Sequence, residues 1–207
     1  MFIDIRKNFA AVITAGAVLA LLTACGGTDN GSMGGHDAST MSGSAPATTT
    51  ASARPEAVAN DADVMFAQMM IPHHQQAVDM ADLAGTRAAD KTVKDLAEKI
   101  RAAQDPEIRT MQGWLTAWGK PMPSGGMSHG MPGIMSEEDM TKLEKAEGTA
   151  FDKQFLHLMI LHHTGAIEMA RTEQSQGSNP EAKELARTIE TAQQAEVEQM
   201  RKILARL

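Results

Sequence analysis

The chain has 207 residues, of which 43% are hydrophobic and only 3% aromatic, and its formal net charge is −7 at pH 7. This length and hydrophobic content can supply one sizeable core, so we expect a single folded domain. The negative charge, without any block of lysine or arginine, argues against a nucleic-acid partner.

Residues 1–24 have the organisation of a signal peptide. Arg6 and Lys7 precede an apolar run (9–22) that is too short to span a bilayer comfortably, so we expect a cleaved signal rather than an anchor. Cys25, the single cysteine, stands where a bacterial lipobox would end. The segment resembles a lipoprotein signal peptide, which implies cleavage before Cys25 and lipid attachment to its thiol. The alternative is an ordinary signal with a chance cysteine.

Residues 25–59 are predicted to be a flexible tether, because glycine, serine, threonine and alanine dominate them. A lipid on Cys25 would hold the folded part at the extracytoplasmic face of the cell membrane. Met33, His36 and Met41 lie in this tether. Methionine gains nothing from packing in a flexible segment, so such loose clusters are candidates for capturing Cu(I).

The rest of the chain, residues 60–207, repeats itself at a constant offset of 89 residues. Residues 63–118 align with 152–207 without a gap, and 18 of the 56 pairs are identical. Identical residues step along the chain by three and four, which marks one face of a helix. In the first repeat they are Asp63, Phe66, Met70, His73, Ala77 and Met80, and in the second Asp152, Phe155, Met159, His162, Ala166 and Met169.

Two helical hairpins are predicted, each with one apolar stripe. In the first, Asn60 is a suitable N-cap for a helix to about residue 87, and a second helix covers about 91–118. The second hairpin covers about 149–176 and 180–207. The stripes cannot be buried in isolated hairpins, so we expect an all-α, ferritin-like four-helix bundle.

Residues 119–135, rich in glycine, proline and methionine, form the predicted connection between the hairpins. It carries a second loose methionine and histidine group: Met122, Met127, His129, Met131 and Met135. Ser136 and Asp139 resemble a capping box and are expected to begin a short helix before Gly148.

A polar layer is predicted in the middle of the bundle. Reflecting His73 through the turn near residues 89–90 places Gln104 and Glu107 at its level, and the second hairpin repeats this with His162, Gln193 and Glu196. His74 and His163 flank the layer, rotated by about 100° around their helices. Methionines are expected close by: Met70, Met111, Met159 and Met200, with Met80 and Met169 further along the histidine face.

Two interpretations of this layer remain open. In a structural network, Glu107 accepts a hydrogen bond from His73, Glu196 accepts one from His162, and the glutamines satisfy the remaining groups. In a metal site, the imidazoles and thioethers favour copper, and Cu(I) in particular, with the glutamates as ligands or as groups that orient the histidines. The matched histidines favour the metal site, whose expected residues are His73, His74, Met70, Met80, Glu107, Met111, His162, His163, Met159, Met169, Glu196 and Met200.

Residues 69–81, 151–170 and the Gln104, Glu107, Met111 and Trp114 helix resemble the bacterial family called domain of unknown function 305. The resemblance covers about residues 60–207. It implies a ferritin-like four-helix fold, an exported or membrane-tethered location and, for some relatives, copper binding and tolerance. The family motif falls here on His73, His74, Met80, His162, His163 and Met169, with Glu107 and Glu196 as the acidic positions.

The expected function is copper binding for sequestration or transfer, with another transition metal as an alternative ligand. A structural or protein-interaction module of the cell envelope is the alternative function. We do not expect an enzyme. Di-iron bundles use Glu-x-x-His, whereas Met70 and Met159 stand three residues before the histidines and only Glu107 and Glu196 fall on the core. A metal-dependent oxidoreductase is therefore the least supported class.

Overall fold

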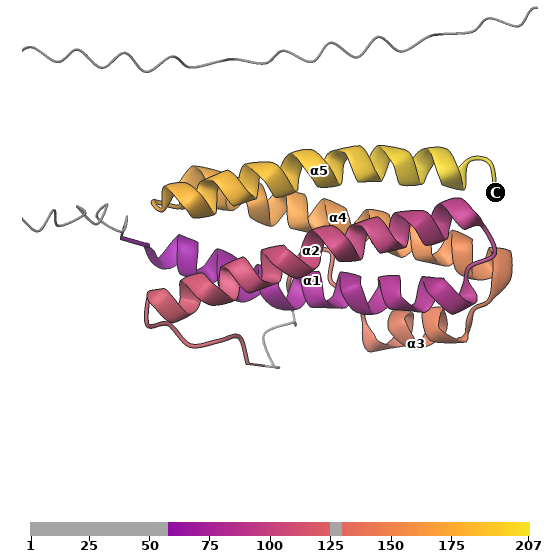
Figure 1. Cartoon of the computed structure of the whole chain (residues 1–207), viewed down its shortest axis with the longest axis horizontal. Helices are drawn as coiled ribbons and strands as arrows, with labels where there is room; N and C mark the ends of the chain where they lie inside the picture. The colour runs from indigo at the N-terminus through magenta and orange to yellow at the C-terminus, as the bar shows by residue number, and fades with distance from the viewer. Residues whose placement is uncertain (1–57, 125–129) are drawn as a thin grey trace, which may run out of the picture. The chain divides into compact units, whose positions relative to one another are not determined.

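The computed structural model describes residues 58–124 and 130–207. This part of the chain is all-α, as predicted, with four long helices and one short one (Figure 1). The helices are α1 (Asp61–Arg87), α2 (Lys91–Ala117), α3 (Glu137–Lys145), α4 (Gly148–Gln176) and α5 (Pro180–Leu204). The predicted signal peptide, Cys25 and nearly all of the predicted tether lie outside the described residues, as do Met127 and His129. No helix in the described part is long and apolar enough to cross a membrane.

The four long helices form a bundle of two hairpins. Helix α1 packs along α2, and α4 packs along α5, while α1 and α4 make the main contact between the hairpins (Figure 1). Helices α2 and α5 meet only marginally. Because α1 and α4 carry the repeated histidines, this arrangement brings the two histidine motifs together.

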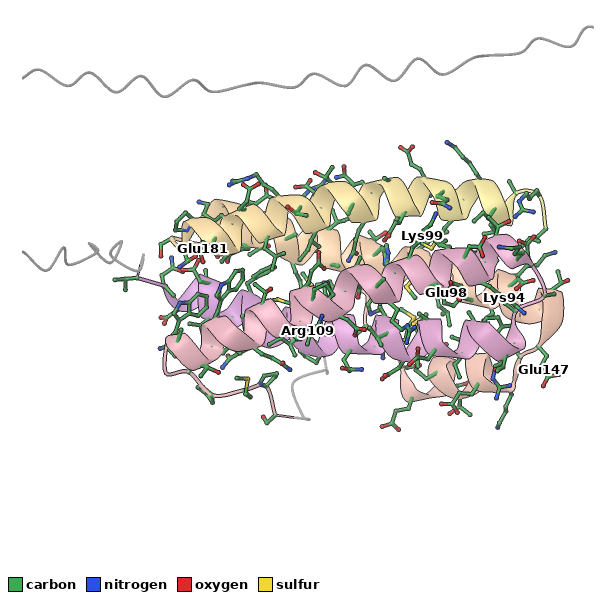
Figure 2. The ribbon with its side chains drawn as sticks, in the orientation of Figure 1. Lys94, Glu98, Lys99, Arg109, Glu147 and Glu181 are labelled. Atoms are coloured by element: carbon green, nitrogen blue, oxygen red, sulfur yellow. The ribbon has the colours of Figure 1, made fainter. Side chains whose placement is uncertain are left out.

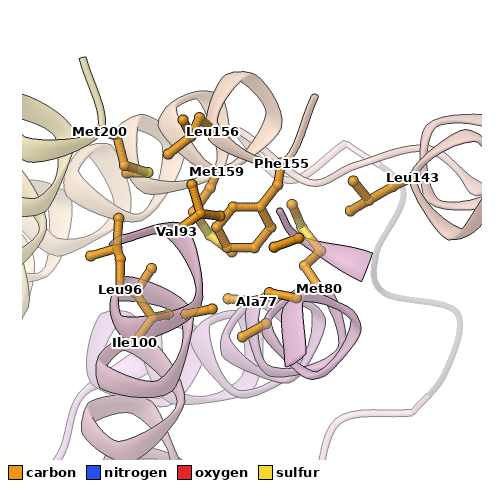
Figure 3. Close-up of a cluster of buried hydrophobic side chains, with 14 of the residues drawn as sticks. Ala77, Met80, Val93, Leu96, Ile100, Leu143, Phe155, Leu156, Met159 and Met200 are labelled. Atoms are coloured by element: carbon orange, nitrogen blue, oxygen red, sulfur yellow. The ribbon is translucent and has the colours of Figure 1, made fainter. Parts of the chain in front are cut away.

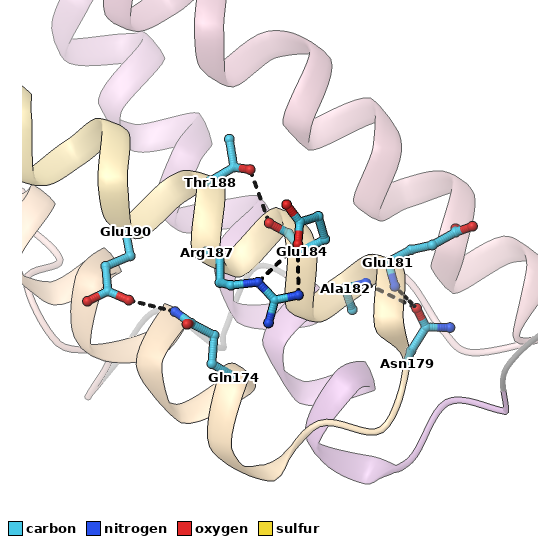
Figure 4. Close-up of polar contacts among 8 residues, drawn as sticks. All are labelled: Gln174, Asn179, Glu181, Ala182, Glu184, Arg187, Thr188 and Glu190. Carbon is cyan, nitrogen blue, oxygen red and sulfur yellow. Dashed lines mark hydrogen bonds and ion pairs between the residues drawn. The ribbon is translucent and has the colours of Figure 1, made fainter.

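The helices begin at polar caps. The Asn60 side chain accepts the backbone N–H groups of Ala62 and Asp63, and the Asp63 carboxylate accepts the Asn60 N–H, which completes a capping box. Ser136 caps α3, as predicted. Asn179 caps α5 by accepting the N–H groups of Glu181 and Ala182 at 2.9 and 3.0 Å (Figure 4).

Two buried carboxylates lock the hairpins to each other. Asp63 of α1 accepts the N–H groups of Ser178 and Asn179 in the α4–α5 turn, at 3.1 and 2.9 Å from its Oδ1. Its repeat counterpart, Asp152 of α4, accepts the N–H groups of Ala89 and Asp90 in the α1–α2 turn, at 3.1 and 3.0 Å. Each hairpin therefore satisfies the turn of the other, and the repeat is visible as approximate two-fold symmetry.

The hydrophobic core consists of two clusters. One lies toward the α1–α2 turn and contains Ala77, Leu96, Phe155 and Met200 (Figure 3). The other lies toward the α4–α5 turn and contains Phe66, Met70, Met111 and Ile189. The histidines fall between the two clusters along α1 and α4, while charged side chains such as Glu98, Lys99 and Arg109 cover the outer surface (Figure 2).

Candidate metal centre

The centre of the bundle is a pair of histidines from equivalent positions of the two repeats. His73 on α1 and His162 on α4 are both fully buried. Their ring centroids are 3.8 Å apart, with an angle of 42° between the ring planes. The two repeats thus contribute one histidine each to a shared pair.

The nitrogen atoms of this pair have few partners. His73 Nε2 lies 3.0 Å from the carbonyl oxygen of Pro132. A carbonyl oxygen only accepts, so Nε2 carries the hydrogen and Nδ1 keeps a lone pair in the neutral ring. Among the described residues, His73 Nδ1 has no hydrogen-bond partner, and the ring nitrogens of His162 have none beyond a weak approach to the backbone of His73. The pair therefore presents buried nitrogen donors.

Burial keeps these two imidazoles neutral. Desolvation, followed by repulsion from His74, lowers the pKa of His73 to about 3. Desolvation, followed by repulsion from His73 and His163, holds the pKa of His162 well below its usual range. At neutral pH both rings are uncharged, which is the state in which imidazole donates to a metal.

The neighbouring histidines are paired with the glutamates. His74 Nε2 lies 2.8 Å from a carboxylate oxygen of Glu107, and His163 Nε2 lies 2.7 Å from one of Glu196. The predicted pairing of the glutamates with His73 and His162 is therefore wrong. Reflection through a turn gives the level of a residue along the bundle but not its rotation, and the residue facing α2 or α5 is the second histidine of each motif.

His74 and His163, which were expected to flank the layer, are both fully buried. Each ring meets its glutamate through Nε2, and neither Nδ1 has a hydrogen-bond partner in the described part of the chain. Carboxylates that hold histidines in this way are typical of metal ligands.

The glutamines do not complete a hydrogen-bond network. Gln104 and Gln193 are 2% and 3% exposed, as expected for residues in the layer. Within the described residues, however, both side-chain polar atoms of Gln104 and the Oε1 of Gln193 have no partner. A buried polar group without a partner costs about 1–3 kcal/mol. The layer is therefore poorly explained as a self-sufficient structural network.

The connection between the hairpins crosses the helices beside this layer. Gly165 lets it approach, because a Cβ there would overlap the Pro132 carbonyl oxygen and lie 2.7 Å from the Cα of Gly133. On α1, Gln76 holds the same segment by accepting the Met135 N–H at 2.7 Å and donating to its carbonyl oxygen at 3.0 Å. Gln76 and Gly165 occupy the same position of the repeat, so this difference between the repeats places Pro132 against His73.

The predicted methionine ligands are all buried. Met80, Met159 and Met200 pack in the cluster toward the α1–α2 turn, and Met70, Met111 and Met169 pack in the other cluster. They lie on both sides of the histidine layer. Among the described residues, no three His, Cys, Asp or Glu side chains form a group that could hold a metal ion. Any ion at the layer would therefore depend on few nitrogen donors or on thioethers.

A family model described as a domain of unknown function, DUF305, matches residues 63–204. The chain belongs to the DUF305 family. Two solved structures of DUF305 proteins are similar to this chain. A DUF305 protein from Streptomyces coelicolor is 35% identical, covers 70% of this chain and 93% of its own, and has a TM-score of 0.66. A DUF305 fragment from Deinococcus radiodurans is 34% identical over 72% of this chain and 99% of its own, with a TM-score of 0.67.

A third solved protein, CopM, connects this fold with metal ions. CopM in its Cu(I)-bound form is 32% identical to this DUF305 chain, covers 70% of it and 96% of its own length, and has a TM-score of 0.60. CopM has also been solved in Cu(II)-bound and Ag-bound forms. A comparison with curated protein sequences finds no match.

One buried acid of this DUF305 chain was missed in the sequence. Glu173 on α4 is 1% exposed, so the expectation of only two core glutamates is wrong. Burial, helped by the adjacent Asp63, raises the pKa of Glu173 to about 8. For Asp63, burial acts to raise the pKa, but hydrogen bonds from Glu173 and from backbone N–H groups outweigh it and lower the value. The only signal in the sequence is a difference between the repeats, because Ala84 aligns with Glu173 at the offset of 89 residues.

Proposed function

We propose that this DUF305 chain is an extracytoplasmic lipoprotein that binds copper, chiefly Cu(I), for sequestration or transfer. The observation that carries the proposal is the pair of neutral, buried imidazoles, His73 and His162, with ring centroids 3.8 Å apart and unpartnered nitrogens. Imidazole suits copper, and thioethers favour its Cu(I) state. The Cu(I)-bound and Ag-bound forms of the similar protein CopM support this choice of ion.

The residues have distinct roles in this proposal. His73, through Nδ1, and His162 are the first donors, because their nitrogens lie at the shared centre. His74 and His163 stand beside this pair, and Glu107 and Glu196 fix their orientation through Nε2. The buried thioethers on either side are the soft donors nearest in the fold. We propose a binding protein and assign it no reaction.

The alternative of a purely structural layer is less well supported. A structural layer gains stability only when its buried polar groups are satisfied. Here the unpartnered atoms are concentrated on the histidines and glutamines of one level. A bound cation would use the nitrogen lone pairs that the protein leaves without a partner.

The test is an anaerobic Cu(I) titration of the purified protein against a competing chelator. We expect His73→Ala combined with His162→Ala to remove the tightest Cu(I) equivalent. The matched control is His157→Ala, since His157 lies on the exposed side of the same helix α4. Unchanged binding in the double variant, with helicity preserved, would contradict the proposal and favour a structural role.

The location is also part of the proposal. It is supported by the signal-like residues 1–24 and by the placement of Cys25, the single cysteine. A lipid on Cys25, together with the tether, would keep the bundle at the membrane surface. Cell fractionation tests this: Cys25→Ala should move the protein from the membrane fraction to the soluble fraction, and an unchanged distribution would contradict lipid anchoring.

A further inference from the structure

A second group of methionines lines a groove on the surface of the bundle. The groove has a volume of about 380 Å³ and lies between the first half of α1 and the second half of α4. Met65, Met69 and Met169 line it, and we call it the methionine groove. Met65 and Met69 also line an adjoining hollow with Met131. Met65 and Met69 therefore line both hollows outside the histidine layer, with Met169 in the first and Met131 in the second.

Core packing does not explain Met65, and it explains Met69 only in part, because Met69 is partly buried against the core cluster toward the α4–α5 turn. Met65 is 59% exposed, so its side chain gains little from burial. Met69 lies four residues later and therefore on the same side of α1. The second repeat has Gln154 and Leu158 at these positions, so the fold does not require methionine there. Met65 thus has little packing role, and its thioether lies on the same side of α1 as that of the partly buried Met69.

The charges around the methionine groove suit a cation. The carboxylates of Asp61 and Glu168 line it and are exposed. No lysine or arginine is among the described residues that line it. Thioether sulfur selects soft ions such as Cu(I), and nearby negative charge raises the local concentration of a cation.

The methionine groove adjoins the histidine pair. Pro132 lines the groove, and its carbonyl oxygen accepts the hydrogen bond from His73 Nε2 at 3.0 Å. Met169 lies seven residues after His162, which places both on the same face of α4. An ion held at the groove is therefore separated from the histidine pair by the connecting segment that touches both.

We propose that the methionine groove is a separate surface site for soft monovalent ions, Cu(I) or Ag(I), from which the histidine pair is loaded. This inference rests on the proposed function for the destination of the ion, but the groove itself stands on its own residues. It assigns metal binding to Met65 and Met69, beside the already expected Met169.

The experiment uses the full chain labelled with ¹³C at the methionine methyl groups and titrated with Ag(I), a diamagnetic ion with the same ligand preference. We expect the methyl signals of Met65 and Met69 to shift on binding, and the Met65→Leu, Met69→Leu double variant to bind one silver ion fewer. Stopped-flow loading of the histidine pair should slow in that variant. Methionine to leucine is nearly volume-conserving, so the fold should persist.

The matched control is Met140→Leu, because Met140 lies on α3, is partly exposed and does not line the methionine groove. It should leave silver stoichiometry and loading rate unchanged. Unshifted Met65 and Met69 signals in excess Ag(I), or equal stoichiometry in the double variant, would overturn the inference.

A third variant, His73→Ala with His162→Ala, separates the two proposals. If its Met65 and Met69 signals still shift, the methionine groove is confirmed as a site, whatever happens to the histidines. If silver binds at the histidines of the parent protein while the groove methyl signals stay still, the inference fails and the proposed function survives.

Discussion

The two repeats place the same side chains in the histidine layer but differ in what covers it. His73 and His162 face each other, and the two histidine–glutamate pairs have nearly equal lengths of 2.8 and 2.7 Å. At one shared position, however, Gln76 holds the connection on one side while Gly165 makes room for it on the other. Duplication therefore preserves the donors, whereas the differences between the repeats determine how the layer is closed and approached.

The largest expected effect on stability comes from adding a side chain at Gly165, where the connection touches α4. In Gly165→Ala, the added Cβ would overlap the Pro132 carbonyl oxygen, which is backbone and cannot rotate away. We expect a loss of about 1–3 kcal/mol in the free energy of unfolding, as for other overpacked positions. Urea denaturation measures this.

Gly113→Ala is the matched control for that variant. Gly113 lies within α2, and a Cβ there would meet no atom within 4 Å. Alanine is favoured over glycine in a helix by about 0.5–1 kcal/mol, so this variant should be more stable than the parent. Equal effects at Gly113 and Gly165 would contradict the close approach of the connection.

The next effect tests whether the two histidine–glutamate pairs are equivalent. Glu107→Gln and Glu196→Gln should each weaken Cu(I) binding about 10–100-fold, because each removes the carboxylate that orients a histidine. The reason to expect similar losses is the near-identical geometry of the pairs. Chelator competition measures both. A loss in only one variant would show that the copper site is not symmetric.

A smaller effect is expected at Glu173, which has no acidic counterpart in the first repeat. Its folded-state pKa is raised to about 8 by burial, so its contribution to stability is fully present below the ordinary value of 4.5 and is lost as pH rises through about 8. Glu173→Gln should therefore become more stable relative to the parent between pH 5 and pH 9, by on the order of 2 kcal/mol.

Urea melts of both proteins at several pH values measure that difference. Asp152→Asn is the comparison at the opposite end of the bundle. Asp152 is the repeat counterpart of Asp63 and also accepts N–H groups from a turn, but Ala84 stands where Glu173 stands in the second repeat. A pH-independent difference between Glu173→Gln and the parent would show that Glu173 is ionised in the folded protein.

The smallest effect is expected on silver affinity at the histidine pair when the pH is lowered. A histidine of ordinary pKa is protonated at pH 5 and would weaken metal binding about 30-fold. The pKa of His73 is about 3, so its ring stays neutral, and silver affinity should change less than about threefold between pH 7.5 and pH 5. A loss of about 1,000-fold, as for two ordinary histidines, would contradict a buried neutral pair.

Much of this architecture could be predicted from the sequence because it depends on periodicity. The repeat fixed the helix pairing, and Asn60 and Ser136 marked true helix starts. Periodicity does not define rotation to within one residue, so Glu107 was paired with His73 although it lies against His74.

Other features had no local signal. The Pro132 carbonyl reaches His73 through a coil segment, and backbone acceptors look alike in a sequence. Asp63 appeared only as a member of the stripe, although it accepts N–H groups from a turn more than 100 residues away. The positions where the repeat is broken, Gln76 with Gly165 and Ala84 with Glu173, were visible but required the structure to interpret.

The central claim is that the two repeats share one copper site at the histidine pair. The most direct measurement is the anaerobic Cu(I) stoichiometry of His73→Ala, His162→Ala and the double variant, with circular dichroism to verify the fold. We expect each single variant to lose the same Cu(I) equivalent as the double variant, because both rings are needed to hold the ion. If each single variant lost a different equivalent and the double variant lost both, the repeats would hold independent sites and the claim would be wrong.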